Sequence, residues 1–67
     1  MRVVVDGVEY ISGATFNMEF CATESTAAKW RCEGMPFVYG SDLGIPKRMA
    51  IYLYPVEKCH AWFRREE

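Results

Sequence analysis

The side chains best suited to binding chemistry lie between residues 25 and 48 of this 67-residue chain. The charged residues of that segment are Lys29, Arg31, Glu33, Asp42, Lys47 and Arg48. They give it a formal charge of +2, whereas residues 1–24 carry −3 and residues 49–67 balance at zero. Lysine, arginine and hydroxyl side chains are the groups that proteins use to contact phosphate. The segment therefore predicts a site for an anionic partner, although the net charge of −1 counts against a strongly basic nucleic-acid binder.

Three cysteines and one histidine are the residues that could bind a metal ion or act as nucleophiles. Cys21, Cys32 and Cys59 have no C-x-x-C spacing, and the adjacent Cys59 and His60 have no partners at a usual zinc-ligand spacing. Nucleophilic catalysis needs a base beside the thiol and a third group that orients the base. We therefore expect no metal, no cofactor and no enzymatic activity. The odd number of cysteines also favours a reducing cytoplasm over a disulfide framework.

The composition predicts one domain covering residues 1–67. Hydrophobic residues make up 51% of the chain and aromatic residues 15%, which is far from a disordered profile. A chain of this length buries only about 60% of its unfolded surface, so we expect aromatic side chains to supply much of a small core. We expect no membrane partner, because no run of about 18 apolar residues occurs.

Residues 1–12 predict a β-hairpin. The pair Asp6-Gly7 lies between two β-branched runs, residues 2–5 and residues 8–11. A two-residue type I′ turn needs positive φ at both central positions, and Asp-Gly is well suited to both.

Residues 15–23 fit two structures. Thr15 and Glu19 could cap a short helix. The alternation of Phe16, Met18 and Phe20 fits a third strand equally well. We favour the helix.

Residues 25–33 predict a helix with clear ends. Ser25 suits the N-cap, because its hydroxyl can accept a hydrogen bond from an otherwise unpaired backbone N–H. Gly34 suits the C′ position, and Pro36 prevents the helix from continuing. Trp30 falls on the expected inner face.

Residues 37–54 predict a second hairpin, with strands at residues 37–39 and 49–53. The long connection between them, with two glycines and a proline, is typical of a functional surface loop. Pro55 then suits the first turn of a final helix. The expected inner face of that helix comprises Val56, Cys59, His60 and Phe63. The expected aromatic core comprises Trp30, Phe37, Trp62 and Phe63.

From Ser25 to Phe63 the chain resembles small phage and plasmid winged helix-turn-helix proteins, including excisionases and the DNA-binding domains of some small terminase subunits. These proteins share a helix with a basic residue before Trp, a turn similar to Gly-Met-Pro, a basic wing, an aromatic strand and a final helix carrying Trp. The matching residues are Ser25, Thr26, Lys29, Trp30, Gly34, Met35, Pro36, Arg48, Tyr52, Val56, Ala61, Trp62 and Phe63. The resemblance implies an α+β fold, a small winged helix-turn-helix core at residues 25–63 with an added N-terminal β-hairpin.

The resemblance also implies that the helix at residues 25–33 enters the major groove of DNA. Thr26 and Lys29 would then face bases or phosphates. Ser25 would bind a phosphate near the helix N-terminus, and Arg31 would lie at the edge of the contact. The alternative is a solvated helix face whose serine is only a cap.

The wing is the second implied contact. Lys47 and Arg48 would contact phosphate or the minor groove, and Tyr39 would stack or bind phosphate. The alternatives are a basic pair that serves solubility and a tyrosine that packs within the hairpin.

We expect double-stranded DNA as the partner and an architectural, non-catalytic role of the excisionase type in the cytoplasm of a bacterial host. A small transcription regulator fits the same features. Because few phosphate contacts are available, a recombinase or a second copy on an adjacent site would add affinity. The alternative function is a phage-encoded protein that inhibits a host or defence factor, since an acidic N-terminal hairpin could extend another protein's sheet.

Overall fold

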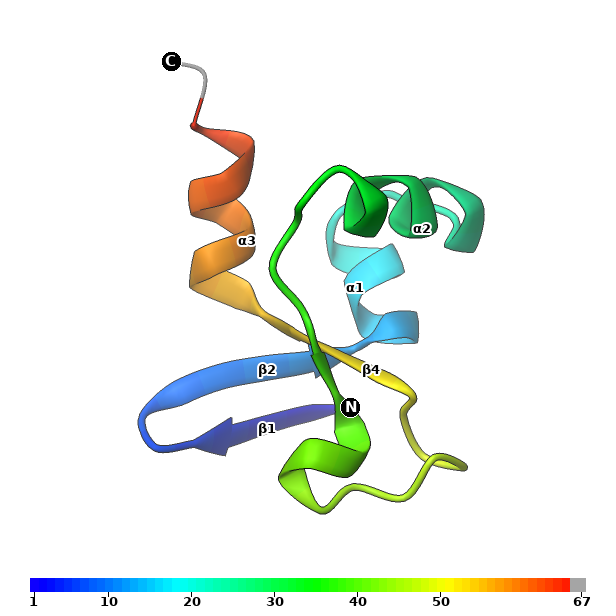
Figure 1. Cartoon of the computed structure of the whole chain (residues 1–67), viewed down its shortest axis with the longest axis vertical. Helices are drawn as coiled ribbons and strands as arrows, with labels where there is room; N and C mark the ends of the chain where they lie inside the picture. Colours follow the sequence, from blue (N-terminus) through cyan, green and yellow to red (C-terminus); the bar gives the residue numbers. More distant parts are fainter. Residues whose placement is uncertain (66–67) are drawn as a thin grey trace.

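The computed structural model describes residues 1–65, in which three helices lie on one side of a four-stranded antiparallel sheet (Figure 1). In chain order the elements are β1 (Arg2–Val5), β2 (Val8–Ser12), α1 (Gly13–Glu19), α2 (Glu24–Cys32), β3 (Val38–Tyr39), the 3-10 helix η1 (Gly40–Leu43), β4 (Tyr52–Pro55) and α3 (Val56–Phe63). The strand order is β1-β2-β4-β3. The fold is therefore α+β with an N-terminal β-hairpin, as predicted. No helix among these residues is long and apolar enough to cross a membrane.

The N-terminal hairpin is confirmed together with its turn. Asp6 and Gly7 have φ angles of +52° and +78°, the pair of positive values that a type I′ turn requires. Strand β2 runs on to Ser12 and pairs with β4, where Ile11 lies opposite Tyr54. The hairpin is thus part of the main sheet.

Residues 15–23 contribute a helix, as we favoured, but its bounds differ. Helix α1 begins directly after Ser12, which occupies the N-cap position, so the expected cap at Thr15 is wrong. Glu19 forms an ion pair with Arg2 of β1. The cap moves because β2 continues to Ser12 and the chain turns straight from strand into helix.

A four-residue connection, residues 20–23, joins α1 to α2. Cys21 has a φ of +53°, and the N–H of Ala22 donates to the carbonyl of Asn17 at 2.9 Å. These features form a Schellman motif, in which the left-handed position is usually glycine. The chain therefore turns sharply here with a cysteine in a conformation that costs L residues free energy.

The start of α2 corrects one prediction. Thr23 is the N-cap, and its hydroxyl accepts a hydrogen bond from the N–H of Thr26 at 3.2 Å. The cap expected at Ser25 is therefore wrong. Thr23 competes for the same role and lies where the chain is still extended.

The end of α2 confirms the prediction that Gly34 occupies the C′ position. Gly34 has a φ of +109°, and the N–H of Met35 donates to the carbonyl of Trp30 at 3.0 Å. This is again a Schellman motif, with Gly34 at C′ as predicted. Met35 and Trp30, which the motif brings together, both belong to the core.

The core lies between the helices and the sheet. Its buried members are Ile11, Phe16, Ala27, Met35, Tyr54 and Cys59. The ring of Phe16 stacks on those of Tyr54 and Phe20, with centroid distances of 4.3 and 4.4 Å. Trp30, Phe37 and Trp62 pack against this cluster, as predicted.

Helix α3 buries less of its predicted inner face than expected. Cys59 is fully buried, but Phe63 remains 36% exposed and His60 is exposed. Both rings still contact the core edge, since Phe63 meets Trp30 edge-on at 4.8 Å and His60 stacks on Phe20 at 4.9 Å. Helix α3 points away from the sheet, so its last turn extends beyond the sheet (Figure 1).

The second hairpin is also shorter than predicted, because β4 begins only at Tyr52. Residues 40–51, which we call the β3–β4 connection, contain η1 and lie on the side of the sheet away from the helices (Figure 1). The N–H of Gly40 donates to the carbonyl of Ile51 at 2.9 Å. A Cβ at Gly40 would lie 2.4 Å from the carbonyl oxygen of Ala50, so only glycine fits this close approach. This backbone contact replaces the strand expected at residues 49–51.

Candidate nucleic-acid interface

Helix α2 presents an exposed face of three residues. Ser25, Lys29 and Cys32 are exposed at i, i+4 and i+7, whereas Ala27 on the opposite face is only 1% exposed. Ser25 and Lys29 thus share one exposed face of α2. Cys32 was not predicted, and its spacing from Ser25 is the signal that could have found it.

Thr26 lies partly inside. It is half-buried, and its hydroxyl is 3.1 Å from that of Thr23. The hydrogen bonds between these two residues hold the first turn of α2. Thr26 therefore belongs to the cap more than to the exposed face.

Arg31, predicted at the edge of the contact, points back toward the sheet. Its side chain is 11% exposed, and its guanidinium lies 3.9 Å from the centroid of the Tyr52 ring. It donates to the hydroxyl of Tyr54 and, at 3.0 Å, to the carboxylate of Glu24. Arg31 therefore ties α2 to β4.

The pKa values agree with this tight packing. Burial by itself would lower the pKa of Arg31, but the hydrogen bonds to Glu24 and Tyr54 outweigh it and raise that pKa. Burial raises the pKa of Tyr54, and the neighbouring guanidinium only partly offsets that rise. Arg31 thus stays charged and paired inside the molecule, which leaves little of its charge for a partner.

The β3–β4 connection presents both basic and apolar side chains. Lys47 and Arg48 are exposed, and Met49 and Ile51 beside them are 57% and 56% exposed. The two apolar residues were not predicted as part of a site. They are exposed because the backbone bonds of the connection, rather than its side chains, hold its shape.

The connection and the start of α2 share a hollow of about 480 Å³. Its lining comprises Ser12, Gly13, Ala14, Glu24, Lys47, Met49, Ala50, Ile51 and Tyr52. Lys47 and Glu24, which lies in the first turn of α2, therefore border the same hollow. Glu24 is the acidic residue in this lining, and its ion pair with Arg31 offsets its charge.

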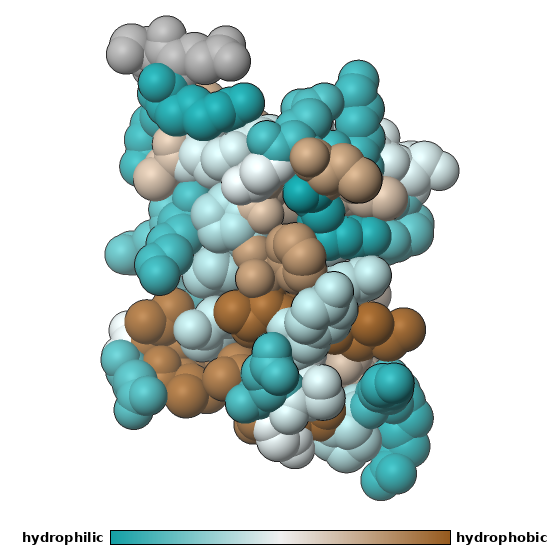
Figure 2. All heavy atoms as spheres, viewed as in Figure 1, coloured by the Kyte–Doolittle hydropathy of each residue, from teal (hydrophilic) through white to brown (hydrophobic). Residues whose placement is uncertain are grey.

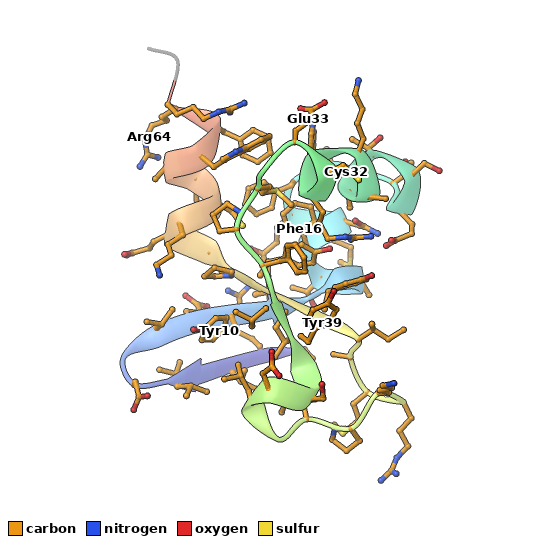
Figure 3. The ribbon with its side chains drawn as sticks, in the orientation of Figure 1. Tyr10, Phe16, Cys32, Glu33, Tyr39 and Arg64 are labelled. Atoms are coloured by element: carbon orange, nitrogen blue, oxygen red, sulfur yellow. The ribbon has the colours of Figure 1, made fainter. Side chains whose placement is uncertain are left out.

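Tyr39 borders this region. Its side chain is 49% exposed, and its ring lies 5.6 Å from those of Phe37 and Tyr52. Figure 3 shows Tyr39 near the middle of the molecule. Cys32, also labelled there, lies at the C-terminal end of α2. Tyr39 and Arg31 therefore both meet Tyr52, which also lines the hollow with Lys47.

The cysteines and His60 form no reactive centre in the part of the chain that the structure describes. Within residues 1–65, no group of three or more His, Cys, Asp or Glu side chains could hold a metal ion. Burial raises the pKa of Cys59 to about 11, and its thiol donates to the carbonyl of Pro36 at 3.4 Å. A thiol with such a pKa stays protonated and unreactive at neutral pH.

The candidate interface thus comprises one exposed face of α2 and a basic and apolar loop, and this loop shares its hollow with Glu24 at the start of that helix. Such an arrangement can bind a long polyanion by contacts to its phosphates. No family model, curated protein or solved structure matches this chain.

Proposed function

We propose that this protein is a winged helix-turn-helix DNA-binding protein of excisionase or small-regulator type, acting architecturally and without catalysis. The observation that carries the proposal is the hollow shared by the start of α2 and the basic β3–β4 connection. In helix-turn-helix proteins the second helix enters the major groove, and its N-terminal residues contact the bases. Helices α1 and α2 follow one another through a four-residue connection, which supports this reading, and in the proposal residues 40–51 serve as the wing.

In this proposal Ser25 and Lys29 contact DNA from the exposed face of α2. Lys47 and Arg48 contact phosphates beside the adjacent minor groove. Arg31 holds α2 at the correct angle and contributes no phosphate contact of its own. Because few cations take part, binding is modest and sensitive to salt. A recombinase or a second copy on an adjacent site would strengthen it.

The apolar residues of the connection give the wing a further role. Minor-groove proteins insert methionine and isoleucine side chains between base steps and so kink the duplex. Met49 and Ile51 are suitably exposed, with two cations directly before them. The proposed architectural role is therefore DNA bending.

Fluorescence anisotropy with duplex DNA at about 50 and about 200 mM salt tests the proposal. We expect binding that weakens steeply with salt and that the double variant Lys47→Glu/Arg48→Glu loses. The matched control Lys58→Glu/Arg64→Glu makes the same charge change on α3 and at its C-cap, and it keeps most of the affinity. Absence of binding at low salt would contradict DNA binding. Equal losses in both variants would contradict the location of the interface.

A protein-binding inhibitor is the second candidate, and the N-terminal hairpin favours it. Residues 1–24 carry a charge of −3, and Val4 in the outer strand is 68% exposed. An exposed strand edge can extend a sheet of another protein. In that case Lys47→Glu/Arg48→Glu would leave the inhibitory activity intact.

A further inference from the structure

Strand β1 forms one border of the sheet. The strand order β1-β2-β4-β3 leaves its outer side without a pairing strand among residues 1–65. Proteins usually protect such a border with charged residues, proline, a bulge or a covering loop. Strand β1 carries one charged residue, Arg2, at its end, and the other three residues of its run Arg2–Val5 are valine.

The hydrogen-bonding groups of this border can be assigned from the hairpin. The N–H of Ser12 donates to the carbonyl of Met1 at 3.0 Å, so Met1 faces β2. Backbone groups alternate along an antiparallel strand, and Val3 and Val5 therefore also face β2. The N–H and C=O groups of Arg2 and Val4 point outward and are available to another strand.

The middle of the border is apolar and accessible. Val4 is 68% exposed, and an open hollow of about 370 Å³ separates it from Glu57 and Lys58 of α3. Figure 2 shows hydrophobic residues gathered over the hairpin, whereas hydrophilic residues dominate the ends of the molecule. Such a patch at a strand border marks a site of association.

The order of charges along β1 favours a second copy of this chain, in antiparallel orientation, as the partner. Arg2 lies at one end, with 45% of its side chain exposed beside its ion pairs, and the exposed Asp6 lies just beyond the other end. Antiparallel pairing with a second copy about Val4 places Arg2 opposite Asp6 and Val3 opposite Val5. Opposite charges and paired β-branched residues both favour such a register, whereas parallel pairing would place like charges together.

We propose that two copies of this chain pair through their β1 borders in antiparallel fashion, joining two four-stranded sheets into one of eight strands. The reciprocal hydrogen bonds between the Val4 residues lie at the two-fold axis. The contact is small, so the dimer forms in the range of weak interfaces. This inference is independent of DNA binding, because none of the residues involved belongs to the proposed interface.

Sedimentation velocity without DNA, over a dilution series from about 1 mM to about 1 μM, tests the proposal. We expect a concentration-dependent dimer that Val4→Pro abolishes, because proline removes the outward N–H without disturbing the bonds to β2. The matched control Val4→Ala keeps that N–H and retains dimer with at most about a tenfold loss of affinity. Circular dichroism verifies that the proline variant is folded.

A second variant keeps the proposal open to refutation if Val4→Pro fails to fold. Asp6→Asn preserves the turn preference but removes the charge opposite Arg2, so dimer affinity should fall by about two- to fivefold. A monomer at every concentration of the unaltered protein would overturn the proposal. A dimer unaffected by both Val4→Pro and Asp6→Asn would also overturn it, since the contact would then lie elsewhere.

Discussion

The helix pair α1–α2 and the β3–β4 connection are held in place by different forces. Phe16 is fully buried between Tyr54 and Phe20, so side-chain packing sets the position of the helix pair. The connection is shaped largely by backbone hydrogen bonds at Gly40 and elsewhere, and four side chains of residues 47–51 remain exposed. The comparison indicates that buried side chains position the helix pair, whereas exposed side chains of the connection are available to contact a partner. Substitutions in the helix pair should affect folding, and substitutions in the connection should affect binding.

The largest effect is expected from Phe16→Ala. Loss of this buried ring should lower the free energy of unfolding by ~3–5 kcal/mol, because its removal leaves a cavity among aromatic neighbours. Urea unfolding followed by circular dichroism measures this change. The control Met18→Ala lies on the same helix, 81% exposed, and should change stability by no more than ~0.5 kcal/mol. Similar values for the two variants would contradict the assignment of the core.

A smaller effect is expected from alkaline pH through Cys59. Its pKa rises from 9.0 to about 11 on folding, so the unfolded thiol ionises first as the pH increases. The resulting stability is complete below about pH 9 and declines as the pH rises toward 11, by up to ~3 kcal/mol. The raised pKa of Tyr54 acts in the same direction.

Unfolding measured at about pH 8 and about pH 11 checks this prediction. The variant Cys59→Ala should be less stable at the lower pH but lose less stability between the two. A parallel decline in both proteins would show that Cys59 is not the group responsible.

The substitution Cys21→Gly, in the connection between α1 and α2, should increase the free energy of unfolding. Cys21 has a φ of +53°, and glycine adopts this conformation without the steric cost, so we expect a gain of ~1 kcal/mol. Cys32→Gly is the matched control, because Cys32 is also exposed but helical and should lose ~0.3 kcal/mol. Thermal unfolding of both variants gives the sign of each change, and a loss at residue 21 would contradict the strained α1–α2 connection.

The smallest effect on stability is expected in the connection. Met49→Ser/Ile51→Ser should change the free energy of unfolding by no more than ~0.5 kcal/mol, because both side chains are more than half exposed. In the proposed function the same variant should reduce DNA bending, measured by energy transfer between dyes at the two ends of a duplex. Unchanged bending would show that Met49 and Ile51 are not part of the interface. A large loss of stability would contradict the expected difference between the helix pair and the connection.

Local chemistry made several elements predictable. Asp6-Gly7 and Gly34 were correctly assigned because positive φ is a property of a few residue types and needs no distant partner. The helix caps were less predictable, since Ser12 and Thr23 compete with the neighbouring hydroxyl residues Thr15 and Ser25 for the same position. Which of them forms a cap depends on where the preceding chain stops being extended.

In the candidate site, too, only the features that depend on local chemistry could be predicted from the sequence. The exposure of Ser25, Lys29, Lys47 and Arg48 follows from their polarity and was expected. The inward direction of Arg31 was not, because it depends on Tyr52 and Tyr54, which lie more than 20 residues later in the chain. The exposure of Met49 and Ile51 likewise contradicts their hydrophobicity and follows from the close backbone contact at Gly40.

The sequence by itself determined most of the elements and their order, the positive φ at Asp6-Gly7 and Gly34, and the segment that carries positive charge. These features depend on residues within a few positions of one another. The tertiary structure decided the rest: that the hairpin joins the main sheet, that Arg31 serves packing, and that the connection and Glu24 of α2 line one hollow. Each of these depends on contacts between segments far apart in the chain, which only the packed core brings together.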